Sequence, residues 1–201
     1  MTLGRNTVLV IACGAIAREL VRIKELNGWS HMELQCLPAD LHNTPDKIPA
    51  AVQAKIDASV AHYNKVFVAY ADCGTGGMLD KMLAEYGIER IPGDHCYEFY
   101  AGSKLFRQLA EAELGSFYLT DFLVRNFERL VVTGLGLDRQ PQLLPVYFRN
   151  YKRVVYLAQT ESEKLQEMAR RQAEYLGLEY HYCHCGDGPL ELVLKPALAD
   201  A

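Results

Sequence analysis

Apolar and polar positions follow two different periods along this chain. Short runs rich in β-branched residues are each followed by a longer segment whose apolar residues recur every three or four positions, as Ile16, Leu20 and Ile23 do. The short runs are typical of strands, and the longer segments are typical of amphipathic helices. The predicted strands cover residues 7–13, 31–39, 65–73, 129–136, 153–160 and, at an edge, 178–185. The predicted helices cover residues 15–28, 48–63, 78–87 and 161–177.

Strands that alternate with helices of this length indicate βαβ units. We therefore expect an α/β fold with a mainly parallel, doubly wound, Rossmann-like sheet. Residues 97–128 have a mostly helical pattern, and no Pro-, Ser- or Gly-rich linker divides the chain. The predicted organisation is a single α/β domain over residues 1–201, with a helical insertion or subdomain at roughly 97–128.

Capping residues mark the helix boundaries. Thr160 stands three positions before Glu163, which is the spacing of a capping box at a helix start. Gly28, Gly87 and Gly177 stand where helices are expected to end, because glycine accepts the left-handed conformation found there. These signals support the predicted alternation of strands and helices.

Composition narrows the classes of partner. The 201 residues are 50% hydrophobic and 23% charged, which allows a sizeable core. The net charge is -4, and the chain has no block of Lys or Arg. Nucleic acid and anionic membranes are therefore not expected as partners, because neutralising their phosphates needs clustered cations. A small-molecule substrate is the expected ligand.

The N-terminal segment does not have the pattern of a secretory signal. Its apolar run is short, no small-residue cleavage site follows, and no later run is long enough to span a bilayer. We therefore expect a cytoplasmic protein. In that compartment the six cysteines are reduced, which favours metal ligation, catalysis or burial over disulfides.

Three cysteines follow predicted strands and precede helical segments. Cys13 and Cys73 are each followed by glycine, and Cys96 comes after a short run at 88–92. The carboxyl ends of parallel strands meet at one edge of the sheet, so these thiols can be neighbours in space. A nearby helix N-terminus favours the thiolate, which is the form that ligates metals and attacks electrophiles.

Three such thiolates can hold a zinc ion with one open coordination position, or a [4Fe–4S] cluster with one free iron. We predict that Cys13, Cys73 and Cys96 ligate one of these two centres. His95 can be a fourth ligand or a proton donor, and Asp72 or Asp94 can orient a ligand or act as acid and base. The predicted catalytic residues are His95 and Asp72, and the glycines expected to let a cofactor approach the backbone are Gly14, Gly74 and Gly76.

Plain burial is the alternative for every cysteine, because free cysteine often packs as a small hydrophobic residue. We expect this of Cys36, which lies inside the apolar stretch LQCL. Near the C-terminus, Cys183 and Cys185 face one side of an extended segment and His184 faces the other. These residues can form a metal clip, a redox pair or simply two half-buried positions on an edge strand.

Six stretches together resemble a family known as the domain of unknown function 1638. They are IACGAIARE, DCGTGG, DHCYEFYAG, GSFYLTDFL, GLGLDRQPQL and VVYLAQT, and they cover nearly the whole chain. The resemblance implies an α/β protein whose relatives occur beside proteins of corrinoid-dependent methyl transfer. It thus implies a role near one-carbon metabolism, with corrinoid or methyltransferase proteins as possible partners, and it supplies no reaction.

Three functions are therefore compatible with the sequence. The first is a metal centre held by cysteines that acts on a small molecule. The second is a non-catalytic accessory module of a corrinoid methyltransferase system. The third is metal-free catalysis by a single thiolate, with His95 as its base.

Overall fold

Two parallel sheets organise the chain, and each lies in its own compact unit. The computed structural model describes residues 7–199; residues 1–6, which begin the segment considered for a signal peptide, and residues 200–201 lie outside it. Unit 1 contains the chain up to Cys96 and from Leu190 onward, and unit 2 contains Tyr97–Pro189. The predicted α/β fold with parallel strands is confirmed, but the strands are divided between two sheets. The single domain stays a prediction.

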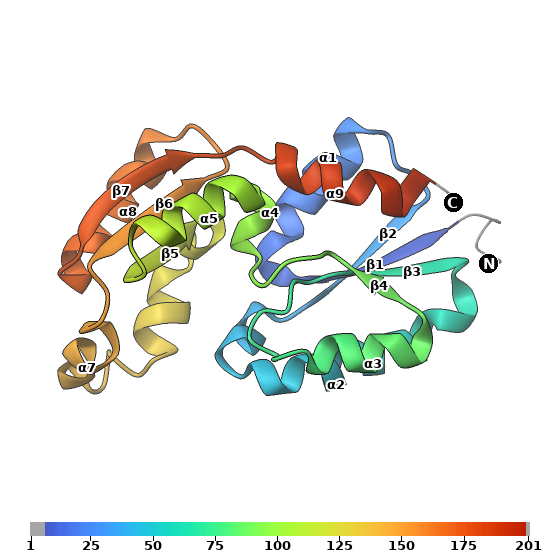
Figure 1. Cartoon of the computed structure of the whole chain (residues 1–201), viewed down its shortest axis with the longest axis horizontal. Helices are drawn as coiled ribbons and strands as arrows, with labels where there is room; N and C mark the ends of the chain where they lie inside the picture. The colour runs from blue at the N-terminus through green and yellow to red at the C-terminus, as the bar shows by residue number, and fades with distance from the viewer. Residues whose placement is uncertain (1–6, 200–201) are drawn as a thin grey trace. The chain divides into compact units, whose positions relative to one another are not determined.

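Unit 1 contains a four-stranded sheet with helices on both faces (Figure 1). In spatial order its strands are β2 (Met32–Leu37), β1 (Val8–Cys13), β3 (Lys65–Ala69) and β4 (Glu89–Arg90). One face is covered by α1 (Ala17–Leu26) and by α9 (Gly188–Ala199), which belongs to this unit from Leu190. The other face is covered by α2 (Ile48–Ser59) and α3 (Met78–Tyr86).

The register of unit 1 brings its strand ends to one edge. All six residues of β1 are buried, as expected of a central parallel strand covered on both faces. Ala12 on β1 pairs with Cys36 on β2 and with Ala69 on β3. The loops after these strands therefore start at the same edge, where open α/β sheets bind their ligands.

Short 3₁₀ turns follow several strands and helices of unit 1. They are η1 (Gly14–Ile16), η2 (Ala39–Asn43), η3 (Pro45–Lys47) and η4 (Val60–His62). At Gly14 a β-carbon would lie 2.9 Å from the carbonyl oxygen of Leu37. Only glycine allows this approach between the end of β1 and the end of β2.

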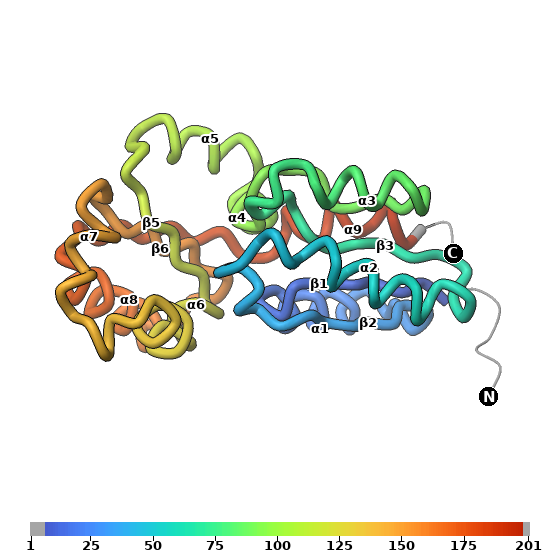
Figure 2. Tube along the Cα trace, turned by 90° about the horizontal axis from the view of Figure 1, so that it is seen from below, coloured from blue at the N-terminus to red at the C-terminus, as the bar shows by residue number. Residues whose placement is uncertain are grey.

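Unit 2 contains a three-stranded sheet in the order β5 (Ser116–Thr120), β6 (Arg153–Ala158) and β7 (Glu179–His184). Its helices are α4 (Tyr97–Ala101), α5 (Ser103–Ala112), α6 (Asp121–Arg125), α7 (Leu144–Phe148) and α8 (Glu163–Leu176). A 3₁₀ turn, η6, covers Pro141–Leu143. Figure 2 shows α5 on one side of β5 and β6, and α6 with α8 on the other. Within residues 7–199, no helix is both long and apolar enough to cross a membrane.

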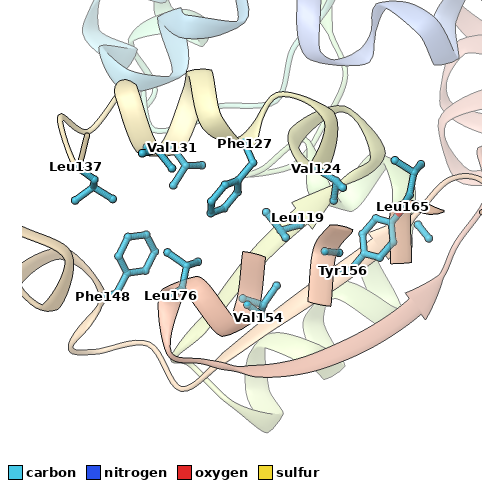
Figure 3. Close-up of a cluster of buried hydrophobic side chains, with 14 residues drawn as sticks. Leu119, Val124, Phe127, Val131, Leu137, Phe148, Val154, Tyr156, Leu165 and Leu176 are labelled. Atoms are coloured by element: carbon cyan, nitrogen blue, oxygen red, sulfur yellow. The ribbon is translucent and has the colours of Figure 1, made fainter. Parts of the chain in front are cut away.

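The main core of unit 2 lies between its sheet and α8 (Figure 3). Leu119 and Val154 come from the strands, and Leu165 and Leu176 come from α8. Phe127 packs in the same cluster. The amphipathic period of residues 161–177 therefore correctly predicted a helix with one buried face.

The strand predicted at residues 129–136 is wrong. Residues Glu128–Thr133 form a π-helix, η5, and the neighbouring Val131 and Val132 are both buried. A short β-branched run has no period that separates a strand from a buried helical turn. The strand of this region is instead β5, which lies within the segment expected to be mostly helical.

The capping predictions have mixed outcomes. Gly87 and Gly177 end α3 and α8 in the left-handed conformation, as predicted. The predicted cap at Thr160 is wrong, because α8 is capped by Ser162, whose hydroxyl accepts a hydrogen bond from the Leu165 N–H. The Thr160 hydroxyl instead donates to Asp121 across a distance of 2.5 Å. A tertiary contact has therefore replaced the local cap.

Candidate functional site

A histidine and two cysteines meet in unit 1. One ligand atom from each of His42, Cys73 and Cys96 lies within 4.8 Å of the other two. Cys96 Sγ is 3.9 Å from His42 Nε2. Both cysteines are buried, and His42 is half-buried. We call these three residues the thiol–imidazole cluster.

The parallel sheet explains why these residues meet. Cys73 follows β3, Cys96 follows β4, and His42 lies in η2 after β2. All three loops leave the carboxyl edge of the same sheet. The predicted convergence of Cys73 and Cys96 at this edge is therefore what the structure shows.

The loop that carries Cys73 is organised by the Asp72 carboxylate. Asp72 Oδ1 accepts hydrogen bonds from the Thr75 hydroxyl at 2.6 Å and the Gly77 N–H at 2.8 Å, and Oδ2 accepts from the Gly76 N–H at 3.0 Å. Burial would raise the pKa of Asp72, but these hydrogen bonds lower it overall. Cys73 itself has a φ of 51°, which is unusual for a residue other than glycine. Asp72 thus holds a turn that presents the sulfur.

Backbone contacts tie this loop to the loop that carries Cys96. The Asp72 N–H donates to the Gly93 carbonyl at 3.1 Å, and the Cys73 N–H donates to the Asp94 carbonyl at 2.9 Å. Arg90 supports the same segment, because its guanidinium donates to the Gly93 carbonyl at 3.1 Å and to the Ile91 carbonyl at 2.8 Å. These contacts hold the two cysteine-bearing loops together.

A carboxylate in turn holds the Arg90 guanidinium. Asp80, on α3, accepts two hydrogen bonds from it, at 2.5 and 2.8 Å. This forked pairing fixes the plane of the guanidinium. Arg90 and Asp80 therefore position the loop without belonging to the cluster.

The cluster favours one thiolate and one imidazolium. A hydrogen bond from the Cys96 thiol lowers the pKa of Cys73 most; burial opposes this effect, and His42 adds to it, so the value falls to about 5. Hydrogen bonds to the sulfurs of Cys13 and Cys73 raise the pKa of His42 to about 10. The neighbouring Cys73 and burial raise the pKa of the Cys96 thiol. At neutral pH the negative charge therefore lies on Cys73, facing a positive His42.

Cys13 lies beside the cluster but outside its 4.8 Å set. Its buried sulfur accepts a hydrogen bond from the Ala15 N–H at 3.5 Å, and it also contacts the His42 ring. Tyr70 is its buried neighbour, and burial followed by the charge of Cys13 raises the pKa of that phenol. Cys13, the predicted third ligand, therefore lies next to His42, and the cluster contains His42 instead of Cys13.

The remaining predicted site residues lie at different positions. His95 is exposed, although it is adjacent to Cys96 in sequence. The predicted burial of Cys36 is wrong: this residue is exposed, because β2 is an edge strand. Gly74 and Gly76 both have positive φ in the Cys73 loop, and Gly14 lies against Leu37. A cofactor contact at these glycines, and a catalytic role for His95 or Asp72, stay predictions.

Sequence reasoning did not find His42. The residue lies in the stretch DLHNTPDK between a predicted strand and a predicted helix. His42 follows a predicted strand, just as Cys13 does, and residues that follow parallel strands meet at the carboxyl edge of the sheet. This position after a strand was the one signal in the sequence that could have marked His42 as a site residue. The strand order that makes β2 a neighbour of β1 comes from the tertiary structure.

The donor set fits a single thiophilic ion. For a tetrahedral zinc ion, bond lengths of about 2.3 Å to sulfur and 2.0–2.1 Å to nitrogen place S and N donors ~3.6 Å apart. The 3.9 Å between Cys96 Sγ and His42 Nε2 is a few tenths of an ångström larger. Iron–sulfur cubanes are held by thiolates arranged around four irons. Two thiols and an imidazole this close together suit one ion better.

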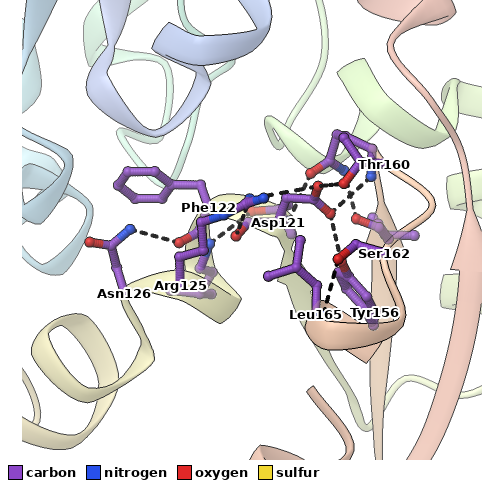
Figure 4. A network of polar contacts seen from close by, with 12 residues as sticks. Asp121, Phe122, Arg125, Asn126, Tyr156, Thr160, Ser162 and Leu165 are labelled. Carbon is purple, nitrogen blue, oxygen red and sulfur yellow. Dashed lines mark hydrogen bonds and ion pairs between the residues drawn. The ribbon is translucent and has the colours of Figure 1, made fainter. Parts of the chain in front are cut away.

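A second polar network lies in unit 2, at the carboxyl ends of β5 and β6 (Figure 4). Asp121 is buried, and its Oδ1 accepts hydrogen bonds from the Tyr156 hydroxyl at 2.6 Å and the Gln159 N–H at 3.1 Å. Thr160 donates to Oδ2, and Arg125 lies 3.7 Å from that oxygen. The stretches GSFYLTDFL and VVYLAQT are thus joined through one carboxyl group.

The fold and the cluster together define an α/β protein with a thiol–imidazole group at the carboxyl edge of a parallel sheet. Residues 36–194 match the model of the family described as "Protein of unknown function (DUF1638)". The chain therefore belongs to the domain of unknown function 1638 family. No curated protein and no solved structure matches it.

Proposed function

We propose that this protein binds a single zinc ion through His42, Cys73 and Cys96 and acts with it on a small molecule. The observation that carries the proposal is the convergence of three zinc-type donors from three loops within 4.8 Å. Catalytic zinc sites keep three protein ligands and one open position. The cluster has this number and these types of donors.

The residues around the cluster prepare it for such an ion. Cys73 already carries the negative charge, so one ligand is in its binding form at neutral pH. When bound there, zinc supplies Lewis acidity and keeps a coordinated thiol deprotonated. His42 gives up its proton on ligation, because only the neutral imidazole nitrogen binds metal. That proton leaves to solvent, and Cys13, beside His42, can contribute a fourth sulfur.

The resemblance to the family directs the substrate proposal toward one-carbon metabolism. A thiolate that accepts a methyl group needs activation in a water-poor site, and Cys73 and Cys96 are both buried. We propose a small thiol or methyl donor as the substrate, in or near corrinoid-dependent methyl transfer. The proposal assumes a reducing compartment, in which these cysteines remain thiols.

A second candidate function is metal-free nucleophilic catalysis by Cys73. The depressed pKa of Cys73 and the adjacent imidazolium favour it, since this pairing activates catalytic cysteines. In this alternative His42, rather than the exposed His95, acts as the base. Selective alkylation of Cys73 in metal-free, active protein would support the alternative.

Metal analysis of anaerobically purified protein tests the main proposal. All proteins in this test carry Cys183→Ser and Cys185→Ser, because those two cysteines lie 3.8 Å apart and can bind a metal ion on their own. We expect about one zinc per chain and no broad visible absorption, because the cluster has the donors of one catalytic zinc site. His42→Ala, Cys73→Ser and Cys96→Ser should each lose the zinc. Cys36→Ser is the matched control, since this exposed thiol lies outside the cluster, and it should keep the metal.

Three outcomes would contradict the zinc proposal. They are protein that takes up no zinc even after reconstitution, zinc retained by the His42→Ala/Cys73→Ser/Cys96→Ser variant, and the brown absorption of an iron–sulfur cluster. Cys13→Ser then determines the ligand number. Retained zinc indicates three protein ligands, and lost zinc indicates four.

A further inference from the structure

Unit 2 carries a pair of cysteines that the proposed zinc site does not use. Cys183 lies near the end of β7, and Cys185 follows that strand directly in extended backbone, so the two side chains face the same side. Their sulfurs are 3.8 Å apart, and both side chains are half-buried. This pair belongs to a different sheet from the thiol–imidazole cluster.

The backbone around the pair is held by the sheet. Cys183 pairs with Leu157 on β6, and the Cys185 N–H donates to the Ala158 carbonyl at 2.9 Å. The Gly186 N–H donates to the same carbonyl at 3.2 Å. The two sulfurs therefore sit at the carboxyl edge of their sheet, which is where parallel sheets bind ligands.

The separation of the sulfurs suits chelation better than a disulfide. A tetrahedral ion at about 2.3 Å from each sulfur places the two ~3.8 Å apart, which is the separation observed here. A disulfide requires about 2.05 Å. Residues two apart in a strand are also separated by ~6.6 Å, close to the upper limit for a bridge. An ion fits without movement of the strand.

The histidine between the two cysteines adds no donor on their side. His184 faces the other side of the strand, where its Nδ1 lies 3.7 Å from a Glu161 oxygen. The two sulfurs are therefore the donors that the pair offers, and they bind a metal ion in the thiolate form.

We propose that Cys183 and Cys185 form a second metal site, a dithiol chelate for a thiophilic divalent ion. Solvent or an incoming ligand completes its coordination. The site is independent of the thiol–imidazole cluster, because it shares no residue or sheet with it.

Cadmium titration of the reduced, metal-free full chain tests this site, with the ultraviolet charge-transfer band of cadmium thiolate as the readout. Wild type should take up two equivalents of cadmium. The double variant Cys183→Ser/Cys185→Ser should take up one, and the triple variant His42→Ala/Cys73→Ser/Cys96→Ser should also take up one. The two sites are thereby counted separately. If the zinc proposal alone fails, wild type takes up one equivalent and Cys183→Ser/Cys185→Ser takes up none.

Cys36→Ser is the control for the loss of an accessible thiol, and it should bind as wild type does. The serine variants place a similar side chain on an edge strand, and circular dichroism checks that they fold. The proposal is overturned if Cys183→Ser/Cys185→Ser takes up as much cadmium as wild type. It is also overturned if either single variant keeps the full uptake.

Discussion

At the scale of single residues, the main finding is that one cysteine in the cluster carries the charge. Cys73 lies between the Cys96 thiol and the His42 imidazole, and Cys96 lowers its pKa most. The same contact raises the pKa of Cys96. Cys73 and Cys96 have the same side chain, but their neighbours shift the pKa values of the two thiols in opposite directions.

The pH dependence of Cys73 can be measured in metal-free protein. The thiolate absorbance of wild type minus that of Cys73→Ser should titrate with a midpoint of about 5. His42→Ala should move the midpoint upward, because the imidazolium no longer stabilises the thiolate. Since the folded-state pKa is below the unfolded value, the thiolate stabilises the fold at high pH, and this contribution is lost as pH falls through about 5.

The control for this titration is Cys36→Ser. Although Cys36 is an exposed residue, partial desolvation of its sulfur, followed by the charge of Cys13, raises its pKa, so its thiolate should appear only in alkaline solution. A Cys73 midpoint near the ordinary cysteine value of about 8.5 would contradict the charge assignment.

At the scale of helices and strands, the loops after parallel strands determine the chemistry. Unit 1 ties the Cys73 and Cys96 loops together through backbone hydrogen bonds and Arg90. Unit 2 ties the ends of β5 and β6 together through Asp121. In each unit a charged side chain near a strand end holds the connecting loops.

Arg90→Gln should weaken zinc binding by about 10–100-fold, as the loss of groups that orient metal ligands does. The variant loses the forked contact with Asp80 and the contacts with the loop carbonyls. Competition with a chromophoric chelator measures the affinity, in protein that also carries Cys183→Ser and Cys185→Ser so that only the proposed zinc site is measured. Lys152→Gln, which removes an exposed ion pair with Glu113 in unit 2, should leave it unchanged. Equal affinities for Arg90→Gln and wild type would show that the guanidinium does not position the ligands.

Asp121→Ala should destabilise unit 2 by about 3–5 kcal/mol, because the groups that donate to this buried carboxyl lose their acceptor. They are the Tyr156 and Thr160 hydroxyls and the Gln159 N–H. Tyr156→Phe removes one of these contacts and should cost about 1 kcal/mol. Urea denaturation measures both variants. If Asp121→Ala and Tyr156→Phe lower the free energy of unfolding equally, the Asp121 carboxyl group is not the centre of the network.

At the scale of the whole molecule, the chain forms two units with separate sheets and separate candidate metal sites. The proposed zinc ligands all lie in unit 1, and the dithiol pair lies in unit 2. A ligand that binds only the folded state of one unit stabilises that unit by mass action.

Hydrogen exchange with and without zinc tests this separation. At a free zinc concentration 1,000 times the dissociation constant, the stabilisation is about 4 kcal/mol. Exchange should slow in β1, β3 and the loops that carry His42, Cys73 and Cys96. The experiment uses Cys183→Ser/Cys185→Ser protein, so that unit 2 offers no dithiol site, and β5 and β6 should then exchange as before. Equal slowing in both units would mean that they unfold together.

The sequence by itself determined the α/β class, the strands β1, β2, β3, β6 and β7, the helices α1, α2, α3 and α8, and the meeting of Cys73 with Cys96. These follow from local periods and from the rule that parallel strand ends share an edge. Only the tertiary structure decided that His42 joins the two cysteines, that Cys36 is exposed, and that residues 128–133 are helical. The reason is physical: strand order, edge position and packing partners depend on residues far apart in the chain, and a local pattern does not record them.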